Sequence, residues 1–335
     1  MAPATIKDLA KELNLSASTV SRALRDHPDI SPLTKKRVIS LANKLDYHPD
    51  SIAQSLQTQK TKTIGVIVPE IKQPFFASVI NGIEELAYSA GYTIIVCQSN
   101  ETYDREVLYT RTLVSHRVAG LLVSLSQTTQ NLDHFKALQR RGVPIVFFDR
   151  VNDDIEASKV VVDDYNGAFA AVDHLIKSGY KRIAHLAGPK NLSISKYRLK
   201  GYKDALKLGN RPYNEELVVY GGLDDTDGVV GFQKLLSLEI LPDAVFAVND
   251  PVATGAFLTI KEHGLKIPDD VALVGFSNTN VSSLLDPPLT TVEQPTYEIG
   301  KTAVQLLLAQ INNSEENFVP QFEVLKTHLI IRGST

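Results

Sequence analysis

The side chains best suited to reading DNA bases lie close together near the start of this chain. Arg22 carries a planar guanidinium that can donate two hydrogen bonds to guanine O6 and N7, and Ala17 is small enough to meet a thymine methyl group. In helical spacing, the residues that point outward from this segment are Ala17, Ser18, Ser21 and Arg22. The first residues of a recognition helix contact base edges, so these positions are candidates for sequence-specific DNA contacts.

Three short helices must position this surface. Thr5 and Asp8 have the spacing of a capping box, Ser16 is a good N-cap for a second helix, and Ser31 followed by Pro32 begins a third. The inward positions that form a core are Ile6, Leu9, Ala10, Leu13, Val20, Ala23, Leu24, Val38, Leu41, Ala42 and Leu45. Hydroxyl groups near helix starts are candidates for phosphate contacts, namely Thr5, Ser16, Thr19, Ser31 and Thr34. The alternative is a three-helix unit that binds only protein.

Length and charge divide the chain into unlike parts. Its 335 residues exceed what a single core normally supports, so at least two folding units are expected. Residues 1–62 contain 10 Lys and Arg against 6 Asp and Glu, a balance of +4, whereas the remaining 25 against 32 give −7. A basic head on an acidic body is typical of a module that neutralises phosphates joined to one that does not.

A polar linker follows the head. Residues 46–50 break the third helix, and Ser51 to Thr58 form one short helical stretch that is too short to be stable without a partner. Leu56 has no evident core nearby, so it either packs on the body or acts as an apolar wedge for a base step in a minor groove. Tyr47 and Ala53 complete the candidate DNA-contacting set. We expect a DNA-binding domain over residues 1–49, a hinge helix and linker over 50–62, and a body over 63–335.

The body alternates short apolar strands with helical stretches. Seven strands are predicted, at Ile64–Val68, Thr93–Cys97, Gly120–Leu125, Pro144–Phe148, Arg182–Leu186, Ala244–Val248 and Val271–Phe276. This pattern favours parallel, doubly wound sheets, and the length favours two of them. Ligands of such sheets bind beyond the carboxyl ends of the strands. The candidates there are Glu70, Phe75, Phe76, Ser124, Asp149, Arg150, Asn249, Asp250, Ser277 and Asn278.

Four motifs occur in order at a familiar spacing: Ile-Lys-Asp-Leu-Ala from Ile6, Ser-x-Ser-Thr-Val-Ser-Arg-Ala-Leu from Ser16, Leu-Asp-Tyr-His-Pro-Asp from Leu45, and Ala-Gln-Ser-Leu from Ala53. With Pro-Pro-Leu-Thr-Thr-Val and Ile-Arg-Gly-Ser-Thr near the end, the chain resembles the lac-repressor (LacI/GalR) family over nearly its whole length. The resemblance implies a helix-turn-helix head and a periplasmic-binding-protein-like body of two lobes joined by three strands. The expected N-lobe covers about 63–162 and 293–325, and the C-lobe about 163–292 and 326–335.

The resemblance also assigns roles. The hinge helices of two subunits would pair in the minor groove, with Leu56 inserted at the central step. The effector pocket would use Phe75 and Phe76 as a wall, Asp149, Asn249 and Asp250 as acceptors, and Arg198 as the central hydrogen-bonding group. Such a set suits a polyol, such as a sugar. Two positions depart from the family pattern: Asp50 replaces the usual Asn, and Ser277 replaces an aspartate found in many relatives, which leaves the ligand's charge open.

Other chemistry is not indicated. Gly300-Lys301-Thr302 lacks the glycine that a phosphate-binding loop requires, and Asp225-x-Asp227-Gly228 lacks the glutamate that ends a calcium loop. The single cysteine, Cys97, excludes an internal disulfide and a cysteine-based zinc site. No apolar leader or membrane-spanning run is evident. We therefore expect a bacterial cytoplasmic, nucleoid-associated protein with no enzymatic activity, no cofactor and no metal.

The sequence thus predicts a transcriptional regulator, most simply a repressor. It would bind double-stranded, pseudo-palindromic operator DNA as a homodimer, with an affinity set by a small-molecule effector, a sugar or sugar derivative, between the lobes. No heptad segment follows Ile331, so a dimer is expected rather than a tetramer. Two alternatives remain: a regulator whose co-effector is a phosphorylated protein, and a solute-binding receptor with a similar two-lobed body.

Overall fold

A computed structural model describes residues 4–24, 26–47, 61–313 and 318–335. The chain divides into two units, Met1–Thr61 and Lys62–Thr335, and each is considered by itself.

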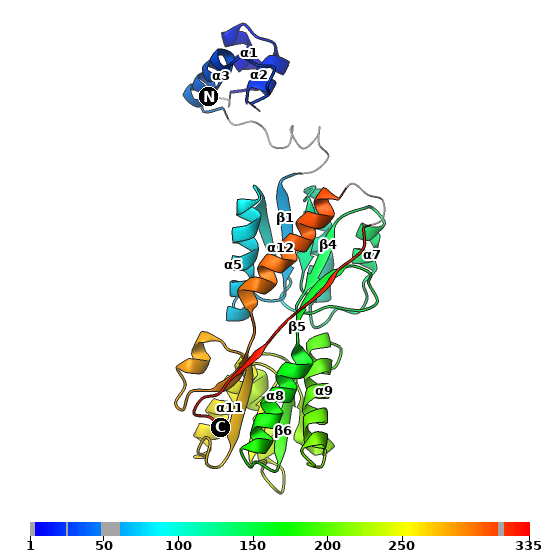
Figure 1. The fold of residues 1–335 in the computed structure, drawn as a ribbon, viewed down its shortest axis with the longest axis vertical. Helices are drawn as coiled ribbons and strands as arrows, with labels where there is room; N and C mark the ends of the chain where they lie inside the picture. The colour runs from blue at the N-terminus through cyan, green and yellow to red at the C-terminus, as the bar shows by residue number, and fades with distance from the viewer. Residues whose placement is uncertain (1–3, 25, 48–60, 314–317) are drawn as a thin grey trace. The chain divides into compact units, whose positions relative to one another are not determined.

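The first unit is the predicted bundle of three helices (Figure 1). They are α1 (Ile6–Leu13), α2 (Ala17–Leu24) and α3 (Pro32–Lys44). The fully buried side chains of Leu9, Val20 and Val38, one from each helix, meet at its centre. A three-helix unit with so few buried residues depends on well-formed helix ends. Ser31 supplies one, because its hydroxyl accepts the backbone N–H of Thr34, as predicted.

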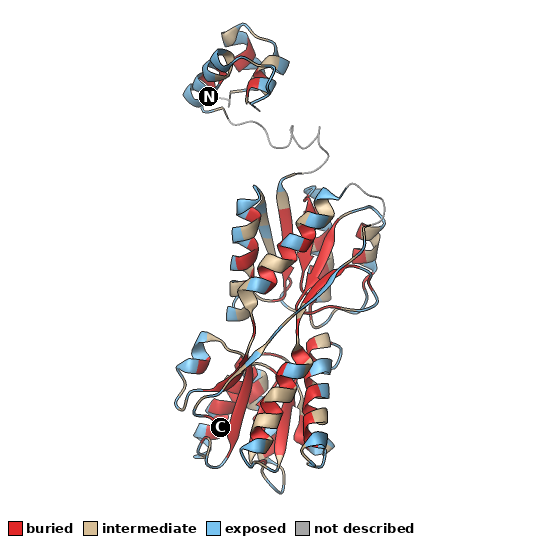
Figure 2. Ribbon diagram, in the orientation of Figure 1, coloured by how far each residue is buried: buried red, intermediate tan, exposed pale blue. Residues whose placement is uncertain are grey.

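The second unit contains two lobes, each built on a six-stranded sheet. In the N-lobe the strand order is β11-β5-β4-β3-β1-β2, and every pair is parallel. The strands are β1 (Thr63–Val68), β2 (Thr93–Gln98), β3 (Gly120–Val123), β4 (Ile145–Phe148), β5 (Ser158–Val162) and β11 (Phe322–Leu325). Helices α5 (Pro74–Ser89) and α12 (Thr296–Asn312) cover one face, and α6 (Tyr103–Ser115) and α7 (Asp133–Gln139) cover the other. The central strands are buried on both sides, so they read as continuous apolar runs (Figure 2).

The C-lobe sheet has the order β12-β10-β9-β8-β6-β7. Its strands are β6 (Ile183–Ala187), β7 (Val218–Tyr220), β8 (Ala244–Ala247), β9 (Ala272–Ser277), β10 (Thr290–Glu293) and β12 (His328–Ile330). Helices α8 (Asp164–Lys177) and α9 (Ser193–Leu208) pack on one face, and α10 (Asp225–Leu236) and α11 (Asp250–Glu262) pack on the other. All pairs are parallel except β10 with β12. The predicted fold class is confirmed, with one antiparallel edge strand added.

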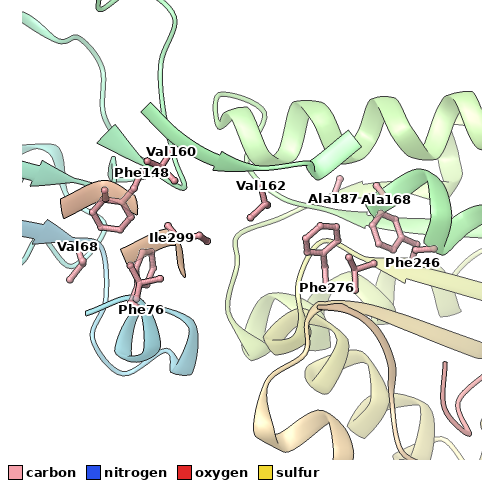
Figure 3. Packing of buried hydrophobic residues seen from close by; sticks show 14 of the residues in the cluster. Val68, Phe76, Phe148, Val160, Val162, Ala168, Ala187, Phe246, Phe276 and Ile299 are labelled. Carbon is pink, nitrogen blue, oxygen red and sulfur yellow. The ribbon is translucent and has the colours of Figure 1, made fainter. Parts of the chain in front are cut away.

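The chain passes between the lobes three times. It leaves the N-lobe after β5 to begin α8, returns between β10 and α12, and leaves again between β11 and β12 (Figure 1). Val162, at the end of β5, lies between the apolar groups of the two lobes: Phe76 and Phe148 are on one side, and Phe246 and Phe276 on the other (Figure 3). Each lobe is therefore assembled from two separate segments of the sequence.

Candidate functional site

The predicted base-reading residues lie on the accessible side of α2. Ala17, Ser18 and Arg22 are exposed and Ser21 is half-buried, whereas Val20 and Ala23 of the same helix are buried. This division follows the helical period, because positions three and four residues apart share a face. The surface thus has the arrangement that a helix needs to contact base edges in a groove.

The hydroxyl groups proposed for phosphate contacts also hold the head together. Ser16 accepts the backbone N–H of Thr19 at 3.1 Å, so it caps α2 as predicted. The N–H and hydroxyl of Thr5 both donate to Asp8, at 2.8 and 2.7 Å, and these bonds lower the pKa of that carboxyl group. The hydroxyl of Thr34 is bonded to that of Ser31 at 2.9 Å. Each of these hydroxyls has a structural role whether or not it also contacts a phosphate.

The remaining DNA-contact predictions fall near or beyond the end of the described head. Tyr47 is half-buried against the three-helix core. Ala53 and Leu56 lie outside the described residues, so their predicted roles stay predictions.

A cleft between the two lobes brings together most of the predicted effector residues. It encloses about 530 Å³ of space, the adjoining open solvent included. The predicted residues that line it are Glu70, Phe75, Phe76, Asp149, Arg150, Arg198, Asn249 and Ser277. The other lining residues are Gln73, Glu101, Ile194, Leu223, Asp224, Pro251, Thr279 and Gln294. Most polar members lie at the end of a strand or within three residues after it, as expected for the carboxyl edges of parallel sheets.

Arg198 is held firmly although it lines the cleft. Its side chain is 2% exposed, its Nε donates to the Asp164 carboxylate at 2.8 Å, and its Nη1 donates to the carbonyl of Val248 at 2.6 Å. Its guanidinium also lies 3.7 Å from the ring centre of Phe276. These contacts use part of its five N–H donors and fix the plane of the group. The remaining donors are therefore pre-oriented for a ligand.

Asp149 is a deeply placed carboxylate with only weak partners. It is 7% exposed, the hydroxyl of Ser124 donates to it at 3.4 Å, and Nε of Arg150 is 3.8 Å away. Burial is the largest influence on this group and raises its pKa to about 6. Its backbone has a φ of 60°, in the left-handed region, where Asp is tolerated better than most residues. Arg150 is directed instead to Glu101, at 2.7 Å.

Asn249 and Ser277 line the cleft, and their side chains differ in the hydrogen bonds that they already make. The Asn249 side chain caps α11 by accepting the N–H of Val252 at 2.9 Å, and its amide donates to the carbonyl of Leu223 at 2.8 Å. Ser277 accepts a hydrogen bond from Nε2 of Gln294 at 2.9 Å. The Oε1 atom of Gln294 is buried without a hydrogen-bond partner among the described residues. Gln294 was not predicted; its place directly after β10 would have indicated it, had that strand been recognised.

Three predicted residues are not part of the cleft lining: Ser124, Asp250 and Asn278, the last of which bonds to Glu293 and Arg332. Ser124 is fully buried and reaches the cleft only through its bond to Asp149. Asp250 is also fully buried, and its carboxylate accepts the N–H of Thr279 at 2.7 Å and the hydroxyls of Ser282 and Thr291 at 2.5 Å each. Because these three donors come from within the C-lobe, the geometry gives Asp250 a structural role.

Hydrogen bonds join the two lobes. Nε2 of Gln73 in the N-lobe donates to Asp224 in the C-lobe at 2.8 Å. Outside the cleft lining, Nδ2 of Asn191 in the C-lobe donates to the carbonyl of Gln127 in the N-lobe at 2.7 Å. These contacts between lobes depend on the angle of the hinge, so the relative position of the lobes and the shape of the cleft are linked.

Two family descriptions match successive parts of the chain. Residues 5–50 match "Bacterial regulatory proteins, lacI family", and residues 61–322 match "Periplasmic binding proteins and sugar binding domain of LacI family". The chain belongs to the LacI family. As a member of this family it is a transcriptional repressor with a DNA-binding head and an effector-binding domain, and not an enzyme.

Individual relatives agree with this assignment. The LacI-family chain is 34% identical over 332 residues to the HTH-type transcriptional repressor CytR of Escherichia coli K12, covering 99% of this chain and 96% of CytR. It is similar to the lac repressor dimer bound to operator and the anti-inducer ONPF, with a TM-score of 0.87, 26% identity and 99% of each chain covered. It is also similar to the complex of the transcriptional regulator CelR with cellobiose, with a TM-score of 0.76, 29% identity, and 99% of this chain and 100% of that one covered.

Within the described part of this LacI-family chain, none of the helices combines the length and apolar character needed to cross a membrane.

Proposed function

We propose that this LacI-family repressor binds a pseudo-palindromic operator as a homodimer. The exposed face of α2 supports the DNA contact, since Ala17 and Ser18 in its first turn and Arg22 in its last turn are accessible. One such face reads a short half-site, and two faces related by two-fold symmetry read a palindrome. The similar lac repressor structure is a dimer on its operator.

The effector in this proposal is a carbohydrate held in the cleft between the lobes. The observation that carries this step is the composition of the lining, in which the aromatic rings of Phe75 and Phe76 face acceptors and pre-oriented donors. Sugars present apolar C–H faces and a ring of hydroxyl groups, and a small number of placed polar groups gives such a pocket its specificity. The similar CelR structure contains cellobiose.

Regulation would follow from the coupling between cleft and hinge. A ligand that binds one lobe angle better than another shifts the population toward that angle. The contacts of Gln73 with Asp224 and of Asn191 with Gln127 join the lobes at the angle of this structure, and a change of that angle would have to break them. The N-lobe, which follows residues 50–62 in the chain, would transmit the change to the DNA-binding heads.

The test uses the full-length chain. Its mass in solution should be that of a dimer, and selection from random oligonucleotides should recover a palindromic site. Adding neutral sugars, cellobiose and ribose among them, should change the affinity for that site in at least one case. A monomer with no preferred DNA sequence would overturn the proposal.

Arg22 provides a prediction about sequence specificity. Replacing Arg22 with alanine removes a possible bidentate contact to guanine, so discrimination at one base pair in each half-site should fall by about 1–3 kcal/mol. The measurement is a binding profile over all single-base operator variants. Arg37→Ala, at an exposed position on α3, is the matched control because it removes the same charge without removing the α2 side chain. An unchanged profile in Arg22→Ala would refute the contact.

A further inference from the structure

Both guanidinium groups of the cleft are already bound to carboxylates. Nη1 of Arg150 donates to the two Glu101 oxygens at 2.7 and 2.8 Å. Arg198 contacts Asp164 through Nε at 2.8 Å and Nη2 at 2.7 Å. A paired guanidinium attracts an anionic ligand less strongly, because its charge is neutralised by the partner at short range. Each arginine of the cleft thus has its charge paired with a carboxylate, although Nε of Arg150 is buried without a hydrogen-bond partner among the described residues and remains free to donate to a ligand oxygen.

Lys72, a cation next to the cleft, is also paired with carboxylates. Nζ of Lys72 lies 3.2 Å from Glu70 and 3.5 Å from Asp224, so one ammonium group faces two carboxylates. The side chain of Lys72 is 63% exposed and can move out of this position, whereas Glu70 is only 17% exposed. The mouth of the cleft thus keeps a negative balance with Lys72 in place.

Asp149 adds a further negative charge deep in the cleft. Its partners at 3.4 and 3.8 Å are too distant to compensate a buried carboxylate. Elsewhere in the same lining, Oε1 of Gln294 is buried and accepts no hydrogen bond from the described residues. A buried acceptor without a donor is costly, so this atom indicates that a ligand with N–H or O–H groups belongs there.

Taken together, the charged groups in and directly around the cleft leave an excess of two negative charges. The carboxylates are Glu70, Glu101, Asp149, Asp164 and Asp224, and the cations are Lys72, Arg150 and Arg198. Such a cleft between low-dielectric walls attracts cations and repels anions.

We infer that the effector is an amino sugar, a carbohydrate that carries a protonated amine and no anionic group. The inference rests on the proposed function, from which the carbohydrate class of the effector is taken. The negative charge of the cleft is the argument for an amine on that carbohydrate. The ammonium group would donate to uncompensated carboxylate and amide oxygens, and the sugar ring would pack on Phe75, because Phe76 behind it is only 3% exposed. A sugar phosphate or sugar acid would place like charges together in a partly desolvated site.

The experiment measures calorimetric affinity of the full-length chain for matched sets of sugars at pH 7. Each set contains a parent hexose (glucose, galactose or mannose), its 2-amino form, its N-acetylated 2-amino form and its 6-phosphate. At least one 2-amino sugar should bind about tenfold more tightly than its parent and its N-acetyl form, and the 6-phosphate should not bind. The N-acetyl form separates charge from substitution at the same carbon.

The pH dependence of sugar binding provides a second test of the inference. Because the pKa of Asp149 is raised to about 6, this carboxylate becomes protonated between pH 7 and pH 5. The advantage of the 2-amino sugar over its parent should therefore shrink in that range. The sugar amine only gains protons as the pH falls, so its charge is not lost in this range. A weaker preference for the 2-amino sugar would therefore come from protonation of the protein. Asp149→Asn should show the smaller preference already at pH 7, whereas Glu262→Gln, at an exposed position at the far end of α11, should behave as the unchanged protein.

The outcomes separate this inference from the proposed function. If a parent hexose, a 6-phosphate or cellobiose binds more tightly than every amino sugar, the amino-sugar inference is wrong. The proposal of a carbohydrate effector would then still hold. If no sugar of any kind binds or alters operator affinity, both the amino-sugar inference and the proposed carbohydrate effector are wrong.

Discussion

Loss of the Arg198 guanidinium should abolish the response to effector while DNA binding persists. Arg198 is the most firmly positioned donor group of the cleft, fixed by Asp164, the Val248 carbonyl and the Phe276 ring. Substitution of Arg198 alone would leave Asp164 as an unpaired buried charge and lower the free energy of unfolding by about 3–5 kcal/mol. The pair Arg198→Gln with Asp164→Asn avoids this, because neutral groups of similar shape replace both charges.

The measurement for this prediction is operator affinity by fluorescence anisotropy, with and without the effector found in the sugar screen. We expect the double variant to bind operator as the parent does and to show no change when effector is added. Lys196→Ala, at an exposed position two residues away on α9, should respond normally. A full dose–response in the double variant would show that Arg198 does not hold the effector.

Replacing Asp250 with alanine should destabilise the C-lobe strongly. The carboxylate bonds to Thr279, Ser282 and Thr291, which come from the loop after β9, the short 3-10 helix Asn280–Ser283, and β10. Removing it leaves three donors without their acceptor in a buried site, and each such loss costs about 1–3 kcal/mol before the structure relaxes. We expect the free energy of unfolding to fall by about 3 kcal/mol or more.

Chemical denaturation followed by circular dichroism checks this expectation. Thr254→Ser, on the same helix, is a mild control because it keeps the hydroxyl that donates to the carbonyl of Asp250. A direct effector contact would give a different result: Asp250→Ala would then lose affinity for effector at nearly unchanged stability, and the structural role assigned to Asp250 would be wrong.

Local signals in the sequence predicted the head well. The spacing of Thr5 and Asp8, and the Ser16 and Ser31 caps, depend only on residues within one turn of helix, and the structure shows the corresponding bonds. The seven predicted strands of the body are also present, because each is a run of mostly apolar residues; six of them are buried on both faces, and the edge strand β2 is only partly buried.

Five strands were not predicted, and four of them have weaker or opposite signals; the fifth, β5, reads Ser-Lys-Val-Val-Val and is largely buried, so its apolar run was a signal that the prediction passed over. Strand β10 reads Thr-Thr-Val-Glu, and its polar residues are buried only because β9, β12 and the Asp250 carboxylate surround them. Strand β11 is largely exposed at a sheet edge, so it lacks an apolar run. Strands β7 and β12 have three residues each, too few for a periodic pattern.

Errors in the candidate site follow from the same limits. The rule that ligands bind at strand ends correctly indicates a region, but it does not say which of two neighbouring side chains faces the cleft. Asn249 lines the cleft and Asp250 does not, because α11 begins at Asp250 and turns its side chain back into the C-lobe. Gln294 was missed together with β10, which precedes it.

The three passages of the chain between the lobes have a consequence for synthesis on the ribosome. The N-lobe sheet needs β11, from residues near the end of the chain, and one of its faces needs α12. Five strands of the C-lobe sheet, β6 to β10, are translated before either. Since domains generally fold as their sequence emerges, the N-lobe must wait, with its apolar strands uncovered, until nearly the whole polypeptide has left the exit tunnel. Truncated translation products should therefore depend on chaperones far more than the finished chain.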